Sequence, residues 1–204
     1  MPILVAQARF LALTGDLDSA RAVLTEAKTA SDELRLTMGG VLVAQVAALT
    51  HSLAGARQEA EEQYRHAVTT LDVAGHRPAA LTMRVLAARE RLGVRPAPEV
   101  APELDELAGQ LDQLDVRGRA LCRASQARVA AATGGEVTGP AEEALRAASA
   151  TDDACLRGDI HFDLARAYRD HGDLDRARAA AELAIAIYTT VGATAPMRKV
   201  SEWI

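Results

Sequence analysis

The sequence predicts an all-α protein: an α-solenoid, wound as a right-handed superhelix, of about five helical hairpins followed by a carboxyl-terminal capping helix. The first observation behind this prediction is a column of small residues, because Gly15, Gly55 and Gly172 are each followed by an alanine after five and after twelve positions. The second is the spacing of these glycines, which is 40 residues and then 117, or three steps of 39. The third is that apolar residues recur at intervals of three and four. A fixed period near 40 with helical sequence inside it is typical of an α-solenoid.

Two weaker copies of the alanine pair fill the long gap and complete the repeat. The leading alanines of the five copies stand at positions 20, 60, 101, 141 and 177. No linker long enough to divide the chain interrupts them, so we predict one repeat domain over residues 1–204. The predicted hairpins span about residues 2–31, 32–75, 77–114, 116–151 and 153–192, and the capping helix spans 195–204.

The first two hairpins have the clearest boundaries. Their helices are expected over about 3–13 and 17–30, then 33–53 and 56–73. Asp16 is a suitable N-cap, and Gly75 closes the second hairpin. Because paired glycines destabilise a helix interior, we expect a kink at residues 39–40.

The remaining helices are expected over about 78–92, 101–114, 118–132, 140–150, 153–171, 174–191 and 196–204. The stretch 93–100 holds two prolines and is predicted to be the least helical part of the chain. Gly192 ends the last hairpin, and Thr194 is a suitable cap for the terminal helix.

Composition and charge exclude several classes of function. Acidic and basic residues are interspersed, with a net charge of −5 and no basic stripe, so direct binding to nucleic acid is not expected. The longest mainly apolar stretch, residues 39–49, is too short to span a membrane, and the start of the chain lacks a secretory pattern. We therefore expect a cytoplasmic protein. Arginine far outnumbers lysine and asparagine is absent, which is typical of a GC-rich bacterial gene.

The motifs of catalysis are missing from the sequence. Cys122 and Cys155 form no CxxC pair, and the five histidines form no HExxH motif. No nucleophile elbow and no phosphate-binding loop occurs. We therefore predict no enzyme activity, no metal and no cofactor.

The last hairpin resembles a tetratricopeptide repeat. With Gly158 as position one, the small and apolar residues of that family's pattern fall at Leu164, Ala165, Tyr168, Gly172, Ala177, Ala181 and Ala184. The first repeat matches at Ala8, Gly15, Ala20, Leu24 and Ala27, and the second at Ala47, Ala48, Gly55, Ala60, Tyr64 and Ala67. The third and fourth are degenerate, with Pro96 and Glu136 where the turn glycine belongs.

The repeat length near 40 is similar to that in bacterial transcriptional regulators of the LuxR and AfsR kind and in related signalling proteins. The resemblance implies a scaffold or adaptor that binds a protein or peptide partner. One alternative is the effector-sensing segment of such a regulator, which would hold a small molecule or peptide in its concave face. Another is an accessory domain of an enzyme.

The resemblance also implies which residues line the concave binding face. They are Arg9, Gln45, Leu49, Met83, Leu86, Glu90, Arg123, Gln126, Phe162, Arg166 and Arg169. We expect Arg123, Arg166 and Arg169 to form a basic patch at the end of an apolar groove. Such a surface suits an amphipathic peptide with an acidic end.

The first helix is apolar at residues 2–6 and has no cap before it. End repeats of a solenoid need a polar outer face. We therefore expect a cover for this helix: a second subunit in a homodimer, an upstream domain, or the array curling back on itself.

Overall fold

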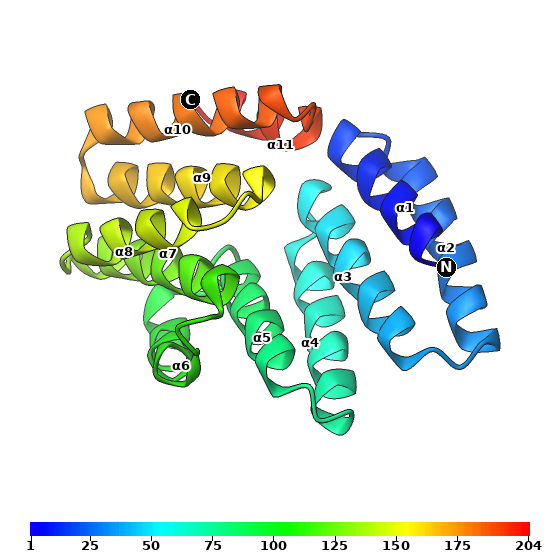
Figure 1. The fold of residues 1–204 in the computed structure, drawn as a ribbon. Coiled ribbons are helices and arrows are strands. Elements are labelled where there is room, and N and C mark those ends of the chain that lie inside the picture. The colour runs from blue at the N-terminus through cyan, green and yellow to red at the C-terminus, as the bar shows by residue number, and fades with distance from the viewer. The chain divides into compact units, whose positions relative to one another are not determined.

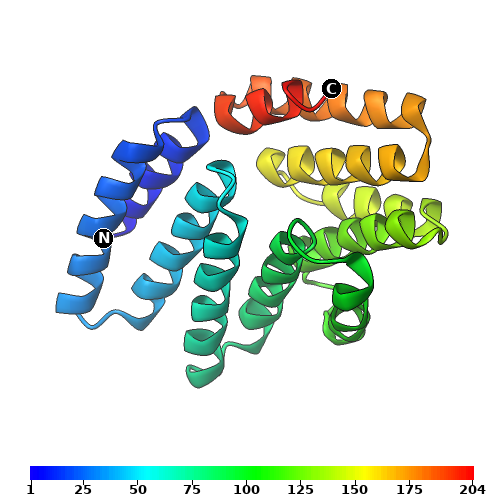
Figure 2. The same cartoon turned by 180° about the vertical axis from the view of Figure 1, so that it is seen from behind.

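All regular secondary structure of the protein is helical, as the computed structural model of residues 1–204 shows (Figures 1 and 2). It has eleven α-helices and no strand, which confirms the predicted all-α class. The chain forms two compact units, Met1–Arg91 and Leu92–Ile204. In each unit, helices that are close in sequence pack side by side, as in a helical repeat protein.

Unit 1 contains five helices. They are α1 (Pro2–Thr14), α2 (Leu17–Glu33), α3 (Thr37–Leu53), α4 (Arg57–Val73) and α5 (Arg77–Arg91). Two hairpins, α1–α2 and α3–α4, pack together through α3, which touches both α1 and α2. The last helix, α5, packs antiparallel on α4, where Arg84 pairs with Asp72 at 2.7 Å and Arg91 with Glu61 at 3.0 Å.

Unit 2 contains six helices. They are α6 (Ala97–Gln110), α7 (Val116–Thr133), α8 (Thr138–Ser149), α9 (Ala154–His171), α10 (Leu174–Thr190) and α11 (Thr194–Ser201). The centre of this unit is α7, which packs on α6, α8 and α9. The terminal helix α11 packs on α10 and covers it, as expected of a cap.

The alanine column lies where helices meet. Ala20 and Ala60 are fully buried and Ala177 is 4% exposed. The predicted turns are confirmed as well, because Gly15 and Gly172 both end their helices in the left-handed conformation, with φ of 95° and 91°. Small residues here let the two helices of a hairpin approach closely, which explains the period of the pattern.

The junction between α2 and α3 differs from the prediction. Helix α2 continues to Glu33, where the next helix was expected to begin, and Arg35 turns the chain with φ of 51°. The glycines at 39–40 consequently lie in the first turn of α3 and do not kink its middle. A Cβ at Gly39 would stand 2.6 Å from the Ser31 hydroxyl, so this glycine permits the close approach of α2.

The proline-rich stretch is more helical than predicted. Helix α6 begins at Ala97 and not at 101, with Pro98 in its first turn and Pro102 further along. A proline in the first turn lacks only an N–H that would have no helical partner there. The boundary between the two units falls between Arg91 and Leu92, so the predicted hairpin 77–114 contributes α5 to unit 1 and α6 to unit 2.

The residue that ends α7 and the residue that caps α11 also differ from the prediction. The glycine that ends α7 is Gly134, with φ of 71°, and not a residue at the Glu136 position. The Gly135 N–H donates to the Ala130 carbonyl at 2.7 Å, a bond that closes the end of the helix. At α11, Thr194 is the first helical residue and Ala193 is the N-cap, without a side-chain hydrogen bond.

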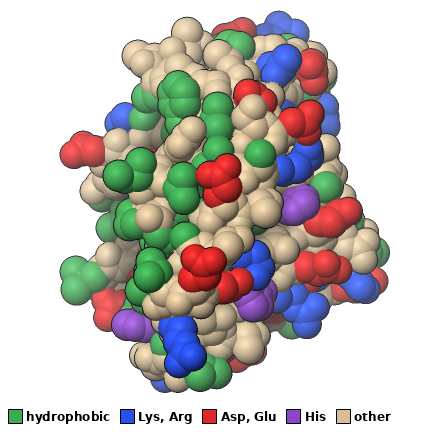
Figure 3. All heavy atoms as spheres, turned by 90° about the vertical axis from the view of Figure 1, so that its right-hand side faces the viewer, with side chains coloured by type: hydrophobic (Ala, Val, Ile, Leu, Met, Phe, Trp, Pro, Cys, Tyr) green, Lys and Arg blue, Asp and Glu red, His purple; other side chains and the backbone are tan.

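Helix α1 exposes apolar side chains. Ile3 is 81% and Phe10 is 66% exposed. On the side of the molecule where α1 and α2 lie, hydrophobic side chains form a band beside a more charged region (Figure 3). The expected cover for this helix stays a prediction. None of the helices combines the length and the apolar character needed to cross a membrane.

Candidate functional site

Helix α9 carries a row of aromatic and cationic side chains. Phe162, Arg166 and Arg169 follow one another at intervals of four and three residues, so they share one face of the helix. The Arg166 guanidinium lies over the Phe162 ring, 3.9 Å from its centroid. A guanidinium that lies over a ring keeps N–H donors that can reach other partners.

Trp203, which follows α11, completes the row. Its ring lies 5.7 Å from that of Phe162, at an interplanar angle of 87°, which is an edge-to-face contact. The Arg169 guanidinium covers the same indole at 3.9 Å from the centroid. The order along the row is therefore Arg166, Phe162, Trp203, Arg169, with each ring in contact with a guanidinium.

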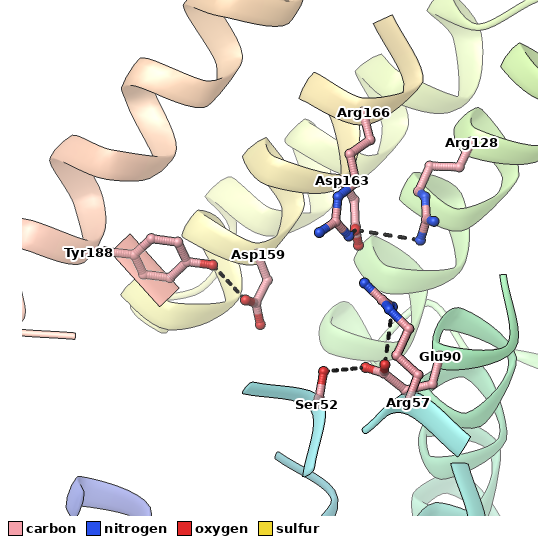
Figure 4. A network of polar contacts seen from close by, with 8 residues as sticks. All are labelled: Ser52, Arg57, Glu90, Arg128, Asp159, Asp163, Arg166 and Tyr188. Carbon is pink, nitrogen blue, oxygen red and sulfur yellow. Dashed lines mark hydrogen bonds and ion pairs between the residues drawn. The ribbon is translucent and has the colours of Figure 1, made fainter. Parts of the chain in front are cut away.

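A buried carboxylate underlies the row. Asp163 is fully buried on α9, and its Oδ1 atom lies 3.6 Å from Arg166 Nη1 and 3.7 Å from Arg128 Nη1 on α7 (Figure 4). These arginine side chains are only 15% and 12% exposed. Asp163 therefore attracts two guanidiniums from adjacent helices and holds Arg166 in the position where it stacks on Phe162.

Local sequence fixes the frame of α9. Asp153 caps its first turn by accepting a hydrogen bond from the Leu156 N–H at 3.0 Å. The Tyr188 hydroxyl of α10 donates to Asp159 at 2.6 Å (Figure 4). Gly158 makes this contact possible, because a Cβ there would stand 2.6 Å from the Tyr188 ring. The helix that carries the row is thus held at its start and along its length.

Arg123 and Gln126 of α7 lie in a different polar network. Arg123 Nη1 donates to Gln126 Oε1 at 2.9 Å, and its Nε pairs with Glu143 of α8 at 2.8 Å. Gln126 in turn donates to Asp105 of α6 at 2.8 Å. This network joins α6, α7 and α8, whereas Arg128 reaches α9. Five residues turn a helix by about 140°, which separates Arg123 from Arg128.

The shared frame of α7 and α9 explains why Arg128, and not Arg123, reaches the site. The N-caps Asp115 and Asp153 are 38 residues apart, and the left-handed glycines that end the two helices have the same offset. On this register, Arg128 of α7 corresponds to Arg166 of α9. Arg123 corresponds to a different position of α9, so the predicted basic patch of three arginines does not form around it.

The predicted residues of unit 1 fall into three groups by exposure. Arg9 on α1 is exposed, and Gln45 and Leu49 on α3 are half-buried. Met83 and Leu86 on α5 are 6% and 4% exposed, so they belong to the packed interior.

Glu90, the sixth predicted residue of unit 1, is also buried, at 2% exposed. Its carboxylate accepts hydrogen bonds from Ser52 Oγ at 2.8 Å and from Arg57 Nη1 at 3.2 Å (Figure 4). These bonds tie α5 to α3 and to the start of α4. Glu90 therefore has a structural role that the sequence pattern did not indicate.

Burial is the main cause of a pKa shift at three titratable groups in unit 2, namely Cys122, His161 and Tyr168, and it raises the pKa of Tyr168. Burial raises the pKa of the Cys122 thiol to about 11, and its sulfur lies 3.4 Å from the Leu104 carbonyl. Burial, with a smaller effect from Arg157, lowers the pKa of His161. No three His, Cys, Asp or Glu side chains come together in a group that could hold a metal ion.

Three members of the α9 site were not predicted: Arg128, Asp163 and Trp203. The 38-residue spacing of the terminating glycines could have identified Arg128. Asp163 and Trp203 occupy positions that the repeat pattern leaves unspecified, so only the structure places Trp203 in the row and Asp163 beneath it.

The fold and this site define an all-α helical-repeat protein with an aromatic and cationic row on one helix. The chain matches no protein-family model, no curated protein and no solved structure.

Proposed function

We propose that this chain is a scaffold of the tetratricopeptide-repeat type that binds a protein or peptide partner and has no catalytic activity of its own. The observation that carries the proposal is the row Arg166, Phe162, Trp203, Arg169 on and beside α9. Aromatic and arginine side chains dominate the binding energy of protein interfaces.

The row also favours a particular ligand chemistry. Arg169 is exposed, and its stacked guanidinium keeps N–H donors available for a carboxylate. The half-buried Trp203 ring beside it offers apolar contact, and Phe162, which is 6% exposed, backs that ring. A peptide with an acidic residue next to an apolar side chain satisfies both requirements.

A selection from a random peptide library on the purified protein tests this function. We expect the enriched peptides to pair Asp or Glu with an apolar or aromatic residue. Replacing Arg169 with Gln should weaken their binding about tenfold or more, because a charge-assisted hydrogen bond is lost. Fluorescence anisotropy of a labelled peptide gives the affinities.

The matched control is Arg178→Gln, since Arg178 is an exposed arginine on α10 outside the row. This variant should bind the peptides as the unchanged protein does. Failure to enrich any peptide would contradict the proposal, and so would equal affinities for the Arg169 variant and the control. Equally tight binding of a small free carboxylate would favour an effector-sensing segment instead.

A further inference from the structure

The Trp203 side chain lies against residues of α9 that the repeat pattern predicts to bind a ligand. Its indole contacts Phe162 and Arg169, two of the predicted binding residues. A side chain from elsewhere in this chain thus already lies against these two residues. The contacts of the indole show which type of side chain fits between Arg169 and Phe162.

The side chain that fits there is an aromatic ring. The guanidinium of Arg169 covers one face of the indole, and Phe162 meets it at an angle of 87°. Cation–π and edge-to-face contacts both depend on a π-system, and a branched aliphatic side chain provides neither. The place therefore selects for aromatic over aliphatic groups.

Trp203 can leave this place at low cost to the fold. Helix α11 ends at Ser201, and the backbone N–H groups of Trp203 and Ile204 both donate to the Val200 carbonyl, at 3.0 and 3.2 Å. Helix α11 itself is anchored by Pro196 and Val200, which are buried. Trp203 is only half-buried and lies outside the helix, so it can move while α11 stays in place.

We propose that Trp203 is the internal occupant of an aromatic subsite, and that the peptide ligand presents an aromatic side chain that replaces it between Arg169 and Phe162. This inference rests on the proposed function and specifies its ligand. The acidic group of the ligand then lies beside Arg169 or Arg166, and its ring takes the place of the indole.

The first test empties the subsite and offers it a defined probe. Trp203→Ala removes the only tryptophan of the chain, so the fluorescence of added N-acetyl-tryptophanamide reports on the probe alone. We expect this variant to bind the probe at least about tenfold more tightly than the unchanged protein, as contacts worth about 1.4 kcal/mol become available. N-acetyl-leucinamide should not compete.

Two double variants establish where the probe binds. Adding Arg169→Leu or Phe162→Leu to Trp203→Ala should abolish the gain, whereas adding Leu183→Ala, at an exposed position of α10, should not. A gain that survives both changes, or no gain in the single variant, would overturn the inference. Circular dichroism confirms that each variant is folded.

The second test uses the intact chain and the peptides selected above. Binding of an aromatic peptide that lacks tryptophan should expose Trp203, with a red-shifted emission and easier quenching by acrylamide. Peptides that bind without changing this emission would refute the subsite and leave the proposed function standing. Absence of any binding peptide would instead refute the function, so the two failures are distinguishable.

Discussion

Two adjacent helices of unit 2, α7 and α9, have the same length and the same types of end residue, but their side chains differ in chemistry. Each has 18 residues, an aspartate N-cap and a terminating left-handed glycine. The frames are offset by 38 residues, which aligns Arg128 with Arg166 and Ser125 with Asp163. The shared N-cap and terminating glycine specify the position of each helix. The single residues between them determine its side-chain contacts.

The residues that differ give the two helices different partners. At the buried position, α9 has Asp163 beside two guanidiniums, whereas α7 has Ser125, whose buried hydroxyl has no hydrogen-bond partner. Where α9 has Phe162, α7 has Ala124, so only α9 offers a ring to an arginine. The proposed binding site therefore lies on α9, and α7 contributes Arg128, which lies beside Asp163.

The largest expected effect comes from replacing Asp163 of α9, compared with Ser125 at the equivalent buried position of α7. Asp163→Ala should destabilise the protein by about 3–5 kcal/mol, because it leaves two guanidiniums beside an empty buried site. Ser125→Ala should change stability by less than about 1 kcal/mol, since no hydrogen bond is lost. Urea denaturation measures both. If both variants lost a similar free energy of unfolding, the buried positions of the two helices would contribute equally to stability.

The second helices of these hairpins, α8 and α10, test whether the shared frame extends further. Ala141 and Ala177 each lie four residues after the N-cap, and they are 0% and 4% exposed. Replacing either with leucine should overpack the crossing and cost about 1–3 kcal/mol. Thermal melts compare them with Arg178→Leu, an exposed neighbour in α10. An unchanged melting temperature in Ala177→Leu would remove that alanine from the crossing.

The two N-caps should differ by a smaller amount. Asp115→Ala loses the bond from the Gly118 N–H, at 2.8 Å, and should cost about 1 kcal/mol. Asp153→Ala loses its cap and also the hydrogen bond from Arg117 at 2.8 Å, which should add up to about 1 kcal/mol. Denaturation midpoints measure the difference. The Arg117→Ala variant checks its origin, because in that background the two caps should become equal.

The sequence was sufficient for the fold because the pattern that carries it is local. Glycines that end helices and alanines that let helices cross repeat at a visible spacing, and the turns at Gly15 and Gly172 are present. The predicted hairpin 77–114 is the exception, because its two helices belong to different units. Helix starts were less predictable. At α6, the first-turn proline permits a helix that starts four residues before the predicted position.

The candidate site was only partly predictable, because one turn has a different length. Ala177 follows its turn glycine by five residues, whereas Ala141 follows Gly134 by seven. Aligning the repeats on their alanines therefore displaced α7 by two residues, so that Arg128 fell outside the predicted binding positions and Arg123 fell on one of them. Trp203 lies outside any repeat, so no repeat pattern could have placed it against α9.

The smallest expected effect is a pH dependence that belongs to α9 alone. Burial lowers the pKa of His161, whereas the equivalent position of α7 holds Arg123, a residue type that does not titrate near neutral pH. An unfolded histidine titrates near pH 6.5, so between that value and the lower folded pKa the unfolded chain binds more protons. Stability should therefore be complete above about pH 6.5 and decrease as the pH falls below it.

Melting temperatures from about pH 7.5 to 5.5 measure the effect of this histidine. The lowered pKa values of Glu136 and Asp173 act in a separate, more acidic range, below their ordinary values of 4.5 and 3.8, so they do not contribute to the slope in this window. Because glutamine keeps a polar side chain of similar size but does not titrate, His161→Gln should flatten the profile. A slope identical to that of the unchanged protein would assign the effect to another group.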